Sequence, residues 1–111
     1  MSAVTTHVLD TAHGRPASGV DVWLSSHDST QWTLLAEATT NADGRVGELG
    51  PNRLEPGDYR LTFATGDYFE RLGVAFFYPL VEITFRITAP EQHYHVPLLL
   101  SPFSYSTYRG S

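Results

Sequence analysis

Short runs of alternating apolar and polar residues, separated by turn residues, constrain the fold of this chain more than any other feature. In one of them, Val20, Val22 and Leu24 occupy every second position, which is the period of a half-buried β-strand. Similar runs occur at residues 5–9, 32–40, 59–63, 83–87, 93–101 and 103–109. The runs are short and no βαβ rhythm connects them, so the sequence predicts an all-β chain folded as an antiparallel β-sandwich.

One segment between these runs has a helical signature instead. Asp67 and Glu70 have the acid-x-x-Glu spacing of a capping box, in which side chains bind the first backbone N–H groups of a helix. Gly73 stands where a helix would end, because glycine tolerates the left-handed conformation of a C-terminal cap. The sequence therefore predicts one short helix that starts near Asp67 and ends before Gly73.

The length of the chain, 111 residues, predicts a single domain spanning residues 1–111, because a second domain would have too little sequence to bury a core. The net charge of −5 disfavours binding to nucleic acid or to an anionic membrane. The longest apolar stretch, residues 73–81, is too short to span a bilayer. The first residues contain no basic region followed by an apolar run, so we expect a cytoplasmic protein with no membrane and no nucleic-acid partner.

The chain lacks two residue types that would widen its chemistry. Without cysteine it has no disulfide, no thiolate metal site and no thiol nucleophile. All seven of its Lys and Arg residues are arginines, which excludes a lysine Schiff base, a lysine general base and a Lys–Asn cross-link. Any positive binding pocket must therefore be built from arginine.

Imidazole, hydroxyl and phenol side chains share faces of the predicted terminal strands. Because successive side chains of a strand point to opposite sides, the residues that share a face are Thr5, His7 and Leu9 in the first strand, His93, His95, Pro97 and Leu99 in the penultimate strand, and Ser104, Ser106 and Tyr108 in the last. Imidazole exchanges protons near neutral pH, so such faces suit acid–base chemistry. A lone strand histidine is nevertheless more often a solvated or hydrogen-bonded structural residue, and Arg45 after a turn is by default a solubility charge. His13 and His27 fall in predicted turns and are interpreted as surface residues.

His93 and His95 also have the spacing of a metal site on a strand, with two imidazoles on one face. No cysteine lies at a similar spacing to complete the ligand set. We therefore expect neither a bound metal nor another cofactor.

Four segments of the chain resemble transthyretin and its relatives. Residues 7–12 (His-Val-Leu-Asp-Thr-Ala) and 14–17 (Gly-Arg-Pro-Ala) resemble their first strand and turn, and residues 66–69 (Gly-Asp-Tyr-Phe) resemble the start of their helix. Residues 98–111 resemble their last two strands, so the resemblance extends from about residue 5 to the C-terminus. This resemblance to the transthyretin-related family implies a prealbumin-like sandwich of two four-stranded sheets with one short helix.

Within this family, hydrolases and hormone carriers differ at a few positions, and there the chain resembles the hydrolases. The hydrolases end in Tyr-Arg-Gly-Ser, as this chain does at residues 108–111. They carry histidines in the first and penultimate strands, matched by His7 and His95, and an arginine after the glycine turn, matched by Arg45. The resemblance implies hydrolysis of 5-hydroxyisourate, the unstable product of urate oxidation, to 2-oxo-4-hydroxy-4-carboxy-5-ureidoimidazoline, without a redox cofactor.

The resemblance also implies catalytic roles for four residues. His7 and His95 would activate water and transfer protons, and Arg45 would stabilise an oxyanion or bind an anionic substrate. Ser111 would orient a histidine or the substrate through its hydroxyl and the terminal carboxylate. Substrate contacts are expected from a set that overlaps the catalytic one: His7, Arg45, Leu99, Tyr108 and Arg109.

For the assembly, the resemblance implies a homotetramer organised as a dimer of dimers. The last strands of two subunits would pair edge to edge, which would cover the exposed edges of a small sandwich. Two such dimers would enclose a central channel, lined by the faces that carry His7, His95, Leu99 and Tyr108.

Two other functions are compatible with parts of this pattern. A transthyretin-like carrier of an aromatic or hormone-like ligand has the same fold, but it has no need for two proton-transferring histidines in its channel. A prealbumin-like adhesion module would often hold a Lys–Asn isopeptide bond and follow a signal peptide, and the sequence has no lysine for such a bond. The hydrolase interpretation therefore ranks first, the carrier second and the module third.

Overall fold

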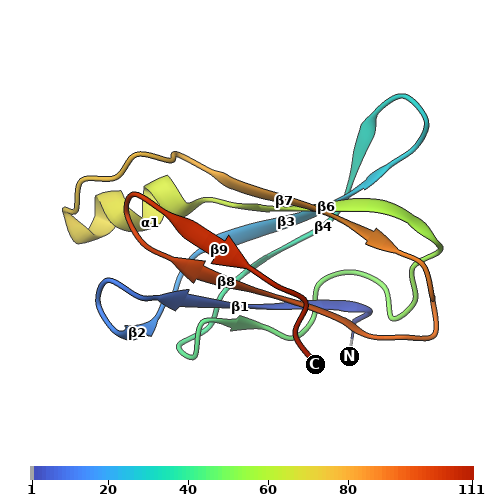
Figure 1. Cartoon of the computed structure of the whole chain (residues 1–111), viewed down its shortest axis with the longest axis horizontal. Helices are drawn as coiled ribbons and strands as arrows, with labels where there is room; N and C mark the ends of the chain where they lie inside the picture. Colours follow the sequence, from blue (N-terminus) through green and yellow to red (C-terminus); the bar gives the residue numbers. More distant parts are fainter. Residues whose placement is uncertain (1) are drawn as a thin grey trace.

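The computed structural model describes residues 2–111 and shows two β-sheets packed face to face (Figure 1). The first sheet has the order β2 (Arg15–Pro16), β1 (Val4–Asp10), β8 (Tyr94–Leu100) and β9 (Tyr105–Thr107), and β5 (Arg45–Val46) pairs with β1 as its fifth strand. The second sheet has the order β4 (Trp32–Thr39), β3 (Asp21–His27), β6 (Gly57–Phe63) and β7 (Val81–Ile87). Helix α1 (Thr65–Leu72) lies at one end of the sandwich, between β6 and β7 in the chain. These features confirm the predicted sandwich with a short helix.

The pairing of β1 with β8 departs from the prediction of an antiparallel sandwich, because these two strands run parallel along seven residue pairs. They come from opposite ends of the chain, so no tight turn joins them and determines their direction. The first sheet also has five strands rather than four. Its extra members, β2 and β5, have two residues each, and two residues cannot display a sequence period.

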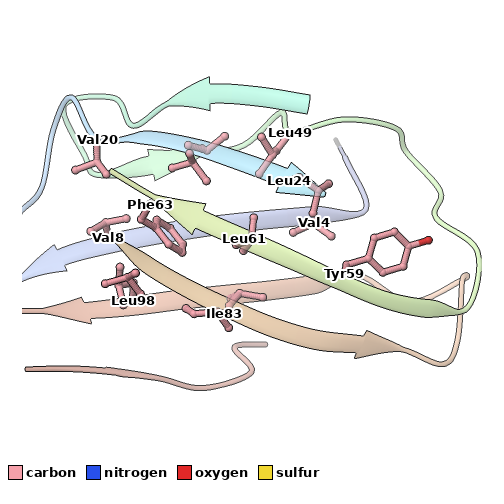
Figure 2. Close-up of a cluster of buried hydrophobic side chains, with 14 of the residues drawn as sticks. Val4, Val8, Val20, Leu24, Leu49, Tyr59, Leu61, Phe63, Ile83 and Leu98 are labelled. Atoms are coloured by element: carbon pink, nitrogen blue, oxygen red, sulfur yellow. The ribbon is translucent and has the colours of Figure 1, made fainter. Parts of the chain in front are cut away.

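Residues at every second strand position fill the space between the sheets (Figure 2). The second sheet contributes fully buried side chains from β3 and β6: Val22, Leu24, Leu61 and Phe63. The facing side chains of the first sheet are Val4, Val8 and Leu98. Each such burial stabilises the folded state by about 1.5–3 kcal/mol relative to exposure. The alternation that predicted the strands is therefore the pattern that builds the core.

Helix α1 ends as predicted but begins earlier than predicted. Gly73 forms its C-terminal cap with a φ of 70°. The helix begins at Thr65, so Asp67 lies inside the first turn and the predicted capping box is wrong. The residue before the helix offers no side-chain cap, and the N–H of Gly66 instead donates to the carbonyl of Pro79, 3.0 Å away. A contact with a later segment of the chain thus starts the helix, and local residue spacing does not reveal such a contact.

The helix closes one end of the core, because Tyr68 and Phe69 bury one of its faces. It has eight residues, and no helix in the described part of the chain is long and apolar enough to cross a membrane.

Candidate active site

The strand register brings four polar side chains together on the outer face of the first sheet. Thr5 is the partner of His95 across the parallel β1–β8 ladder, and His7 is the partner of Arg45 across the β1–β5 ladder. Neighbouring residues such as Val8 point into the core, so these four side chains point away from it. The strand period thus placed Thr5, His7 and His95 on the correct faces, and the pairing decides which side chains meet.

A pocket of about 330 Å³ opens on this face, where β1, β5 and β8 meet the C-terminal residues. Its lining consists of Thr5, Thr6, Arg45, Val46, Gly47, His93, His95 and Ser111. The structure therefore brings together Arg45, His95 and Ser111, three of the four residues that the sequence predicted as catalytic. The fourth, His7, is not in the lining but lies beside it as the cross-strand partner of Arg45.

His95 is the half-buried imidazole of this pocket, and its Nδ1 lies 2.8 Å from the hydroxyl oxygen of Thr5. Burial is the largest influence on the pKa of His95 and lowers it, and the positive charge of Arg45 lowers it further, followed by His93 and His7. A hydrogen bond with the backbone of Thr5 acts in the opposite direction without cancelling these effects. His95 is therefore neutral at neutral pH, the state in which an imidazole accepts a proton.

His7 has one ring nitrogen held by the turn that precedes β5. Its Nε2 lies 2.9 Å from the backbone carbonyl oxygen of Asp43. A carbonyl oxygen only accepts hydrogen bonds, so Nε2 must carry the proton that is donated. In the neutral ring, Nδ1 is then the unprotonated nitrogen and can accept a hydrogen bond.

The turn before β5 holds Arg45 at the pocket. The side-chain oxygen of Asn41 accepts hydrogen bonds from the backbone N–H groups of Asp43 and Arg45, at 2.9 and 3.0 Å. Gly44 has a φ of 74°, and a Cβ atom there would clash with the carbonyl oxygen of Val8, so this position requires glycine. The turn predicted from the sequence thereby determines where the guanidinium reaches the outer face.

The C-terminal segment lies directly against His95. The N–H of Gly110 donates to the carbonyl of His95 at 2.8 Å, and a Cβ atom on Gly110 would lie 2.6 Å from the His95 ring. Arg109 lies over the ring of Tyr94, 4.3 Å from its centroid, and donates to the carbonyl of His93 at 3.2 Å. These contacts hold the tail beside the pocket and leave the Arg109 side chain outside the lining.

The other residues predicted to bind substrate also lie outside this pocket in the single chain. Tyr108 and Arg109 line a second hollow, of about 360 Å³, together with Phe85 of β7. Leu99 is half-buried on the outer face that carries His95, further along β8. These three side chains are therefore absent from the lining of the pocket of His95, and their contact with substrate stays a prediction.

Thr5 and His93 also belong to the site, although no catalytic role was predicted for them. The Thr5 hydroxyl oxygen lies 2.8 Å from His93 Nε2 and 2.8 Å from His95 Nδ1, so it bridges the two imidazoles. The strand period placed Thr5 on the face of His7, but its pairing with His95 joins residues 90 positions apart, which the period does not reveal.

Within residues 2–111, no group of three or more His, Cys, Asp or Glu side chains could hold a metal ion.

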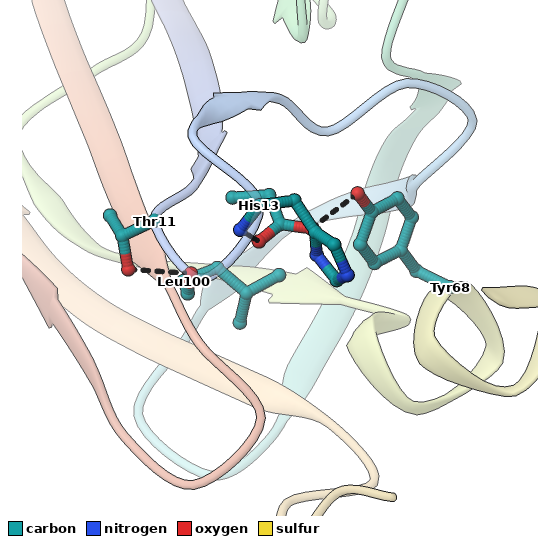
Figure 3. A network of polar contacts seen from close by, with 5 residues as sticks. Thr11, His13, Tyr68 and Leu100 are labelled. Carbon is teal, nitrogen blue, oxygen red and sulfur yellow. Dashed lines mark hydrogen bonds and ion pairs between the residues drawn. The ribbon is translucent and has the colours of Figure 1, made fainter. Parts of the chain in front are cut away.

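His13 is exposed, as predicted, and it also has a structural role (Figure 3). Its ring Nδ1 lies 2.7 Å from the carboxylate of the buried Asp10, and its backbone N–H donates to the same carboxylate at 2.9 Å. The hydroxyl of Tyr68 donates to Asp10 from helix α1, at 2.7 Å. This network ties the end of β1 to the helix.

His27 is exposed as predicted, with its ring 4.7 Å from that of Trp32.

Comparison with known proteins agrees with this architecture. A family model described as the HIUase/Transthyretin family matches residues 4–110. A 5-hydroxyisourate hydrolase of Mus musculus is 51% identical over 113 aligned residues, which cover 99% of this chain and 96% of the relative.

Solved structures of a hydrolase and of a transthyretin share the fold. The structure of Klebsiella pneumoniae 5-hydroxyisourate hydrolase matches with a TM-score of 0.87 and 40% identity, over 97% of this chain and 98% of that one. Sea bream transthyretin in complex with thyroxine matches with a TM-score of 0.90 and 33% identity, over 97% of this chain and 94% of that one. The chain therefore belongs to the HIUase/transthyretin family.

Proposed function

We propose that this protein is a 5-hydroxyisourate hydrolase of urate breakdown. It adds water to an amide carbonyl of the six-membered ring and forms 2-oxo-4-hydroxy-4-carboxy-5-ureidoimidazoline. The observation that carries the proposal is the pocket in which a neutral imidazole, His95, and the guanidinium of Arg45 lie together, with His7 beside them. The 51% identity with a mouse protein named 5-hydroxyisourate hydrolase supports the same activity.

A carrier of small ligands is the alternative within the family, since sea bream transthyretin with thyroxine has the same fold. A shared fold does not separate the two functions, so the site must do so. A neutral apolar ligand would leave the guanidinium of Arg45 desolvated without a negative partner, which is costly. Ring opening of a urate-derived substrate uses both the positive charge and the neutral base.

The proposed reaction begins with activation of water, which is a poor nucleophile until a base removes a proton. A proton of water moves to His95 while the oxygen adds to the amide carbonyl, whose own oxygen becomes negatively charged. The planar guanidinium of Arg45 donates hydrogen bonds to this oxyanion. The ring carbon–nitrogen bond then breaks, and the departing nitrogen takes a proton from His95, which restores the neutral base. No metal or redox cofactor takes part in these steps.

His7 and Ser111 complete the proposed site. The unprotonated Nδ1 of His7 accepts a hydrogen bond from the water or from a ring N–H of the substrate, because its Nε2 is held by the turn. The hydroxyl of Ser111 contacts the substrate from the C-terminal segment, at the pocket lining. Leu99, Tyr108 and Arg109 contribute to substrate binding in the assembled protein.

The proposal includes a homotetramer, built as a dimer of dimers. Large apolar side chains are exposed around β9 and in the segment before β7: Phe77, Tyr78, Leu80, Phe103, Tyr105 and Tyr108. The rings of Tyr78 and Tyr105 lie 5.4 Å apart, so the two groups adjoin. An exposed edge strand beside an apolar patch favours pairing with a second copy.

The proposal also places the enzyme in the cytoplasm, which rests on the sequence alone and is tested by cell fractionation.

The activity is tested with 5-hydroxyisourate generated in situ by enzymatic oxidation of urate. The protein is expected to accelerate the decay of its absorbance, and His95→Ala is expected to lower kcat/KM by roughly two to four powers of ten. His27→Ala is the matched control, because His27 lies on the other sheet and packs against Trp32. A decay rate that is the same with and without the protein would refute the proposed function.

A further inference from the structure

The hydroxyl of Thr5 connects two imidazoles at one side of the pocket. Its oxygen lies 2.8 Å from His95 Nδ1 and 2.8 Å from His93 Nε2. Thr5 is 7% exposed, His95 is half-buried, and His93 is exposed. The contacts therefore run from the candidate base, through a buried hydroxyl, to a ring that solvent reaches.

The hydrogen-bond roles along these contacts depend on one another. A hydroxyl has one proton to donate, and the described residues give the Thr5 hydroxyl no third hydrogen-bond partner. If both imidazoles donated to Thr5, its proton would be buried without an acceptor, which costs free energy. One imidazole therefore donates to Thr5 and the other accepts from it, so the proton positions on His93 and His95 are coupled.

We propose that Thr5 and His93 form a proton relay that sets the tautomer of His95 and exchanges its protons with solvent. The inference rests on the proposed function, in which His95 is the base. In the resting state His95 Nδ1 donates to Thr5, and the Thr5 hydroxyl donates to His93 Nε2. The second nitrogen of His95, Nε2, is then unprotonated and available to the substrate water.

The relay balances protons when His95 Nε2 takes one from water. The proton on His95 Nδ1 passes to the Thr5 oxygen, and the former hydroxyl proton passes to His93 Nε2. One positive charge moves from His95 to His93, and no bond between heavy atoms changes. His93 then releases its Nδ1 proton to solvent. For the second step the same transfers run in reverse: His93 takes a proton from solvent at Nδ1, and a proton returns through Thr5 to His95 Nδ1. The positive His95 then donates its Nε2 proton to the departing ring nitrogen, which restores the resting state.

The surroundings of His95 explain why such a relay would be useful. A positive His95 would face the guanidinium of Arg45 on β5, the ring of His7 on β1 and the ring of His93. Burial and these neighbours lower the pKa of His95, so a lasting positive charge there is unfavourable. Transfer through Thr5 places the charge on an exposed ring, where water and salt screen it.

The role of the Thr5 hydroxyl in the relay is tested with two substitutions at position 5. Thr5→Val removes the hydroxyl and keeps the branched shape, whereas Thr5→Ser keeps the hydroxyl. Thr5→Val is expected to lower kcat by roughly ten- to a hundredfold with KM within about twofold, and Thr5→Ser is expected to restore kcat to within about threefold of the parent. Imidazole ¹⁵N NMR is expected to show the His95 proton on Nδ1 in the parent and a shift toward the Nε2-protonated form in Thr5→Val.

The release of the proton from His93 to solvent is tested by chemical rescue of His93→Ala. Its kcat is expected to be lowered in dilute buffer and to rise severalfold when free imidazole is added, because a dissolved base replaces the missing ring. His27→Ala, an exposed histidine of β3, is the control that should show neither effect.

Several results would overturn the relay. Parental kcat in Thr5→Val, an equal loss in folded Thr5→Ser, or a His93→Ala protein that ignores imidazole would each refute it. If Thr5→Val does not fold, the Ser variant and the rescue of His93→Ala decide by the same criteria. The NMR result separates the relay from the activity: a parent without hydrolase activity refutes the proposed function, whereas a parent with His95 protonated at Nε2 refutes the relay.

Discussion

At the scale of single residues, Arg45 is the side chain whose replacement best separates an enzyme from a carrier. It lines the pocket with His95, and its guanidinium is the charge proposed to stabilise the oxyanion. Arg45→Gln is expected to lower kcat/KM by about 10²–10³, the usual effect of removing one oxyanion donor. Arg45→Lys should recover only part of the loss, because an ammonium lacks the planar fork of donors. Steady-state kinetics on 5-hydroxyisourate provide the measurement, with Arg53→Gln as the control, since Arg53 pairs with Glu55.

The same substitution should also weaken competition by planar purine-like anions such as 8-azaxanthine. One group would then serve both binding and charge stabilisation, so KM and kcat should change together. A Gln variant that binds these anions and turns over like the parent would show that Arg45 is a surface charge after a turn. The carrier function would then gain support.

His95 is expected to make the activity pH-dependent. Burial, followed by the charge of Arg45, holds the pKa of His95 below its ordinary value of about 6.5. Only the unprotonated ring acts as a base, so kcat/KM should be constant near neutral pH and fall on the acid side, with a midpoint below about 6.5. Arg45→Gln removes a positive charge and should move this midpoint to higher pH. Profiles of both proteins provide the test, and a missing acid limb or a downward shift would contradict it.

The sequence could predict which side chains share a face but not which of them touch. The period of two placed Thr5 and His7 on one face of β1 and His95 on one face of β8. Their contacts depend on the parallel register between strands from opposite ends of the chain, and no local pattern encodes that register. For this reason His95 and Arg45 were predicted as site residues from the resemblance, whereas the bridging role of Thr5 was missed.

At the scale of elements, the turn before β5 gives a test of how backbone conformation positions the site. Gly44 and Gly14 both have positive φ, of 74° and 67°, but only at Gly44 would a Cβ atom clash, with the Val8 carbonyl oxygen. Gly14→Ala should cost about 1–2 kcal/mol for the left-handed conformation alone. Gly44→Ala should cost more, about 2–4 kcal/mol once the clash is added, and should also lower kcat/KM because Arg45 is displaced. Urea unfolding and kinetics provide the measurements, and equal costs at the two positions would disprove the argument.

The elements could be predicted where a local signal defines them. The long strands follow from alternation, and the end of α1 follows from Gly73. The start of α1 does not, because the N–H of Gly66 finds its acceptor in Pro79, beyond the helix. The strands β2 and β5 are likewise defined by their partner β1 rather than by their own two residues.

At the scale of the whole molecule, stability in acid should depend on the buried carboxylate of Asp10. Burial by itself raises the pKa of Asp10, but hydrogen bonds from Tyr68 and His13 outweigh it and hold the pKa below its ordinary value. Burial and Asp10 raise the pKa of Tyr68 to about 12, so its hydroxyl remains a donor. The folded carboxylate binds protons less readily than the unfolded one. Its stabilisation is therefore present above about pH 3.9 and is lost as the pH falls through the lower folded value.

Asp10→Asn tests this stabilisation. It is expected to lower the free energy of unfolding at pH 7 by about 1.5–3 kcal/mol, because hydrogen bonds to a charged acceptor are replaced by weaker ones. The difference from the parent should shrink toward pH 3. Urea unfolding at several pH values measures it, with Asp21→Asn as the control, since Asp21 is exposed and accepts a hydrogen bond from Thr39. A difference that is independent of pH would assign the loss to packing rather than to charge.

The architecture of two packed sheets could be predicted from alternation, whereas the open edges of the sheets could not. Which strands lie at an edge depends on the strand order, and that order follows from long-range pairing. In the structure β9 is an edge of the first sheet, and its three residues are exposed. The edge of the sandwich that carries Tyr105 is therefore the surface on which the proposed assembly depends.

Charge placed on this edge should dissociate the proposed tetramer. Tyr105 of β9 is 40% exposed and contacts the ring of Tyr78, so Tyr105→Arg puts a cation into the apolar patch and onto the strand edge. Size-exclusion chromatography with light scattering should show a tetramer for the parent and smaller species for the variant. Leu34→Arg is the matched control, because Leu34 is 57% exposed on the distant edge strand β4 and should leave the mass unchanged.

The activity of the dissociated variant then shows whether one chain holds a complete site. Tyr108 and Arg109 line a hollow separate from the pocket of His95 and Arg45, so their predicted contact with substrate requires a second subunit. Tyr105→Arg should therefore lose activity in step with mass, while Leu34→Arg keeps both. A monomeric variant with parental kcat/KM would show that the pocket of one chain suffices, and a parent that runs as a monomer would refute the proposed assembly itself.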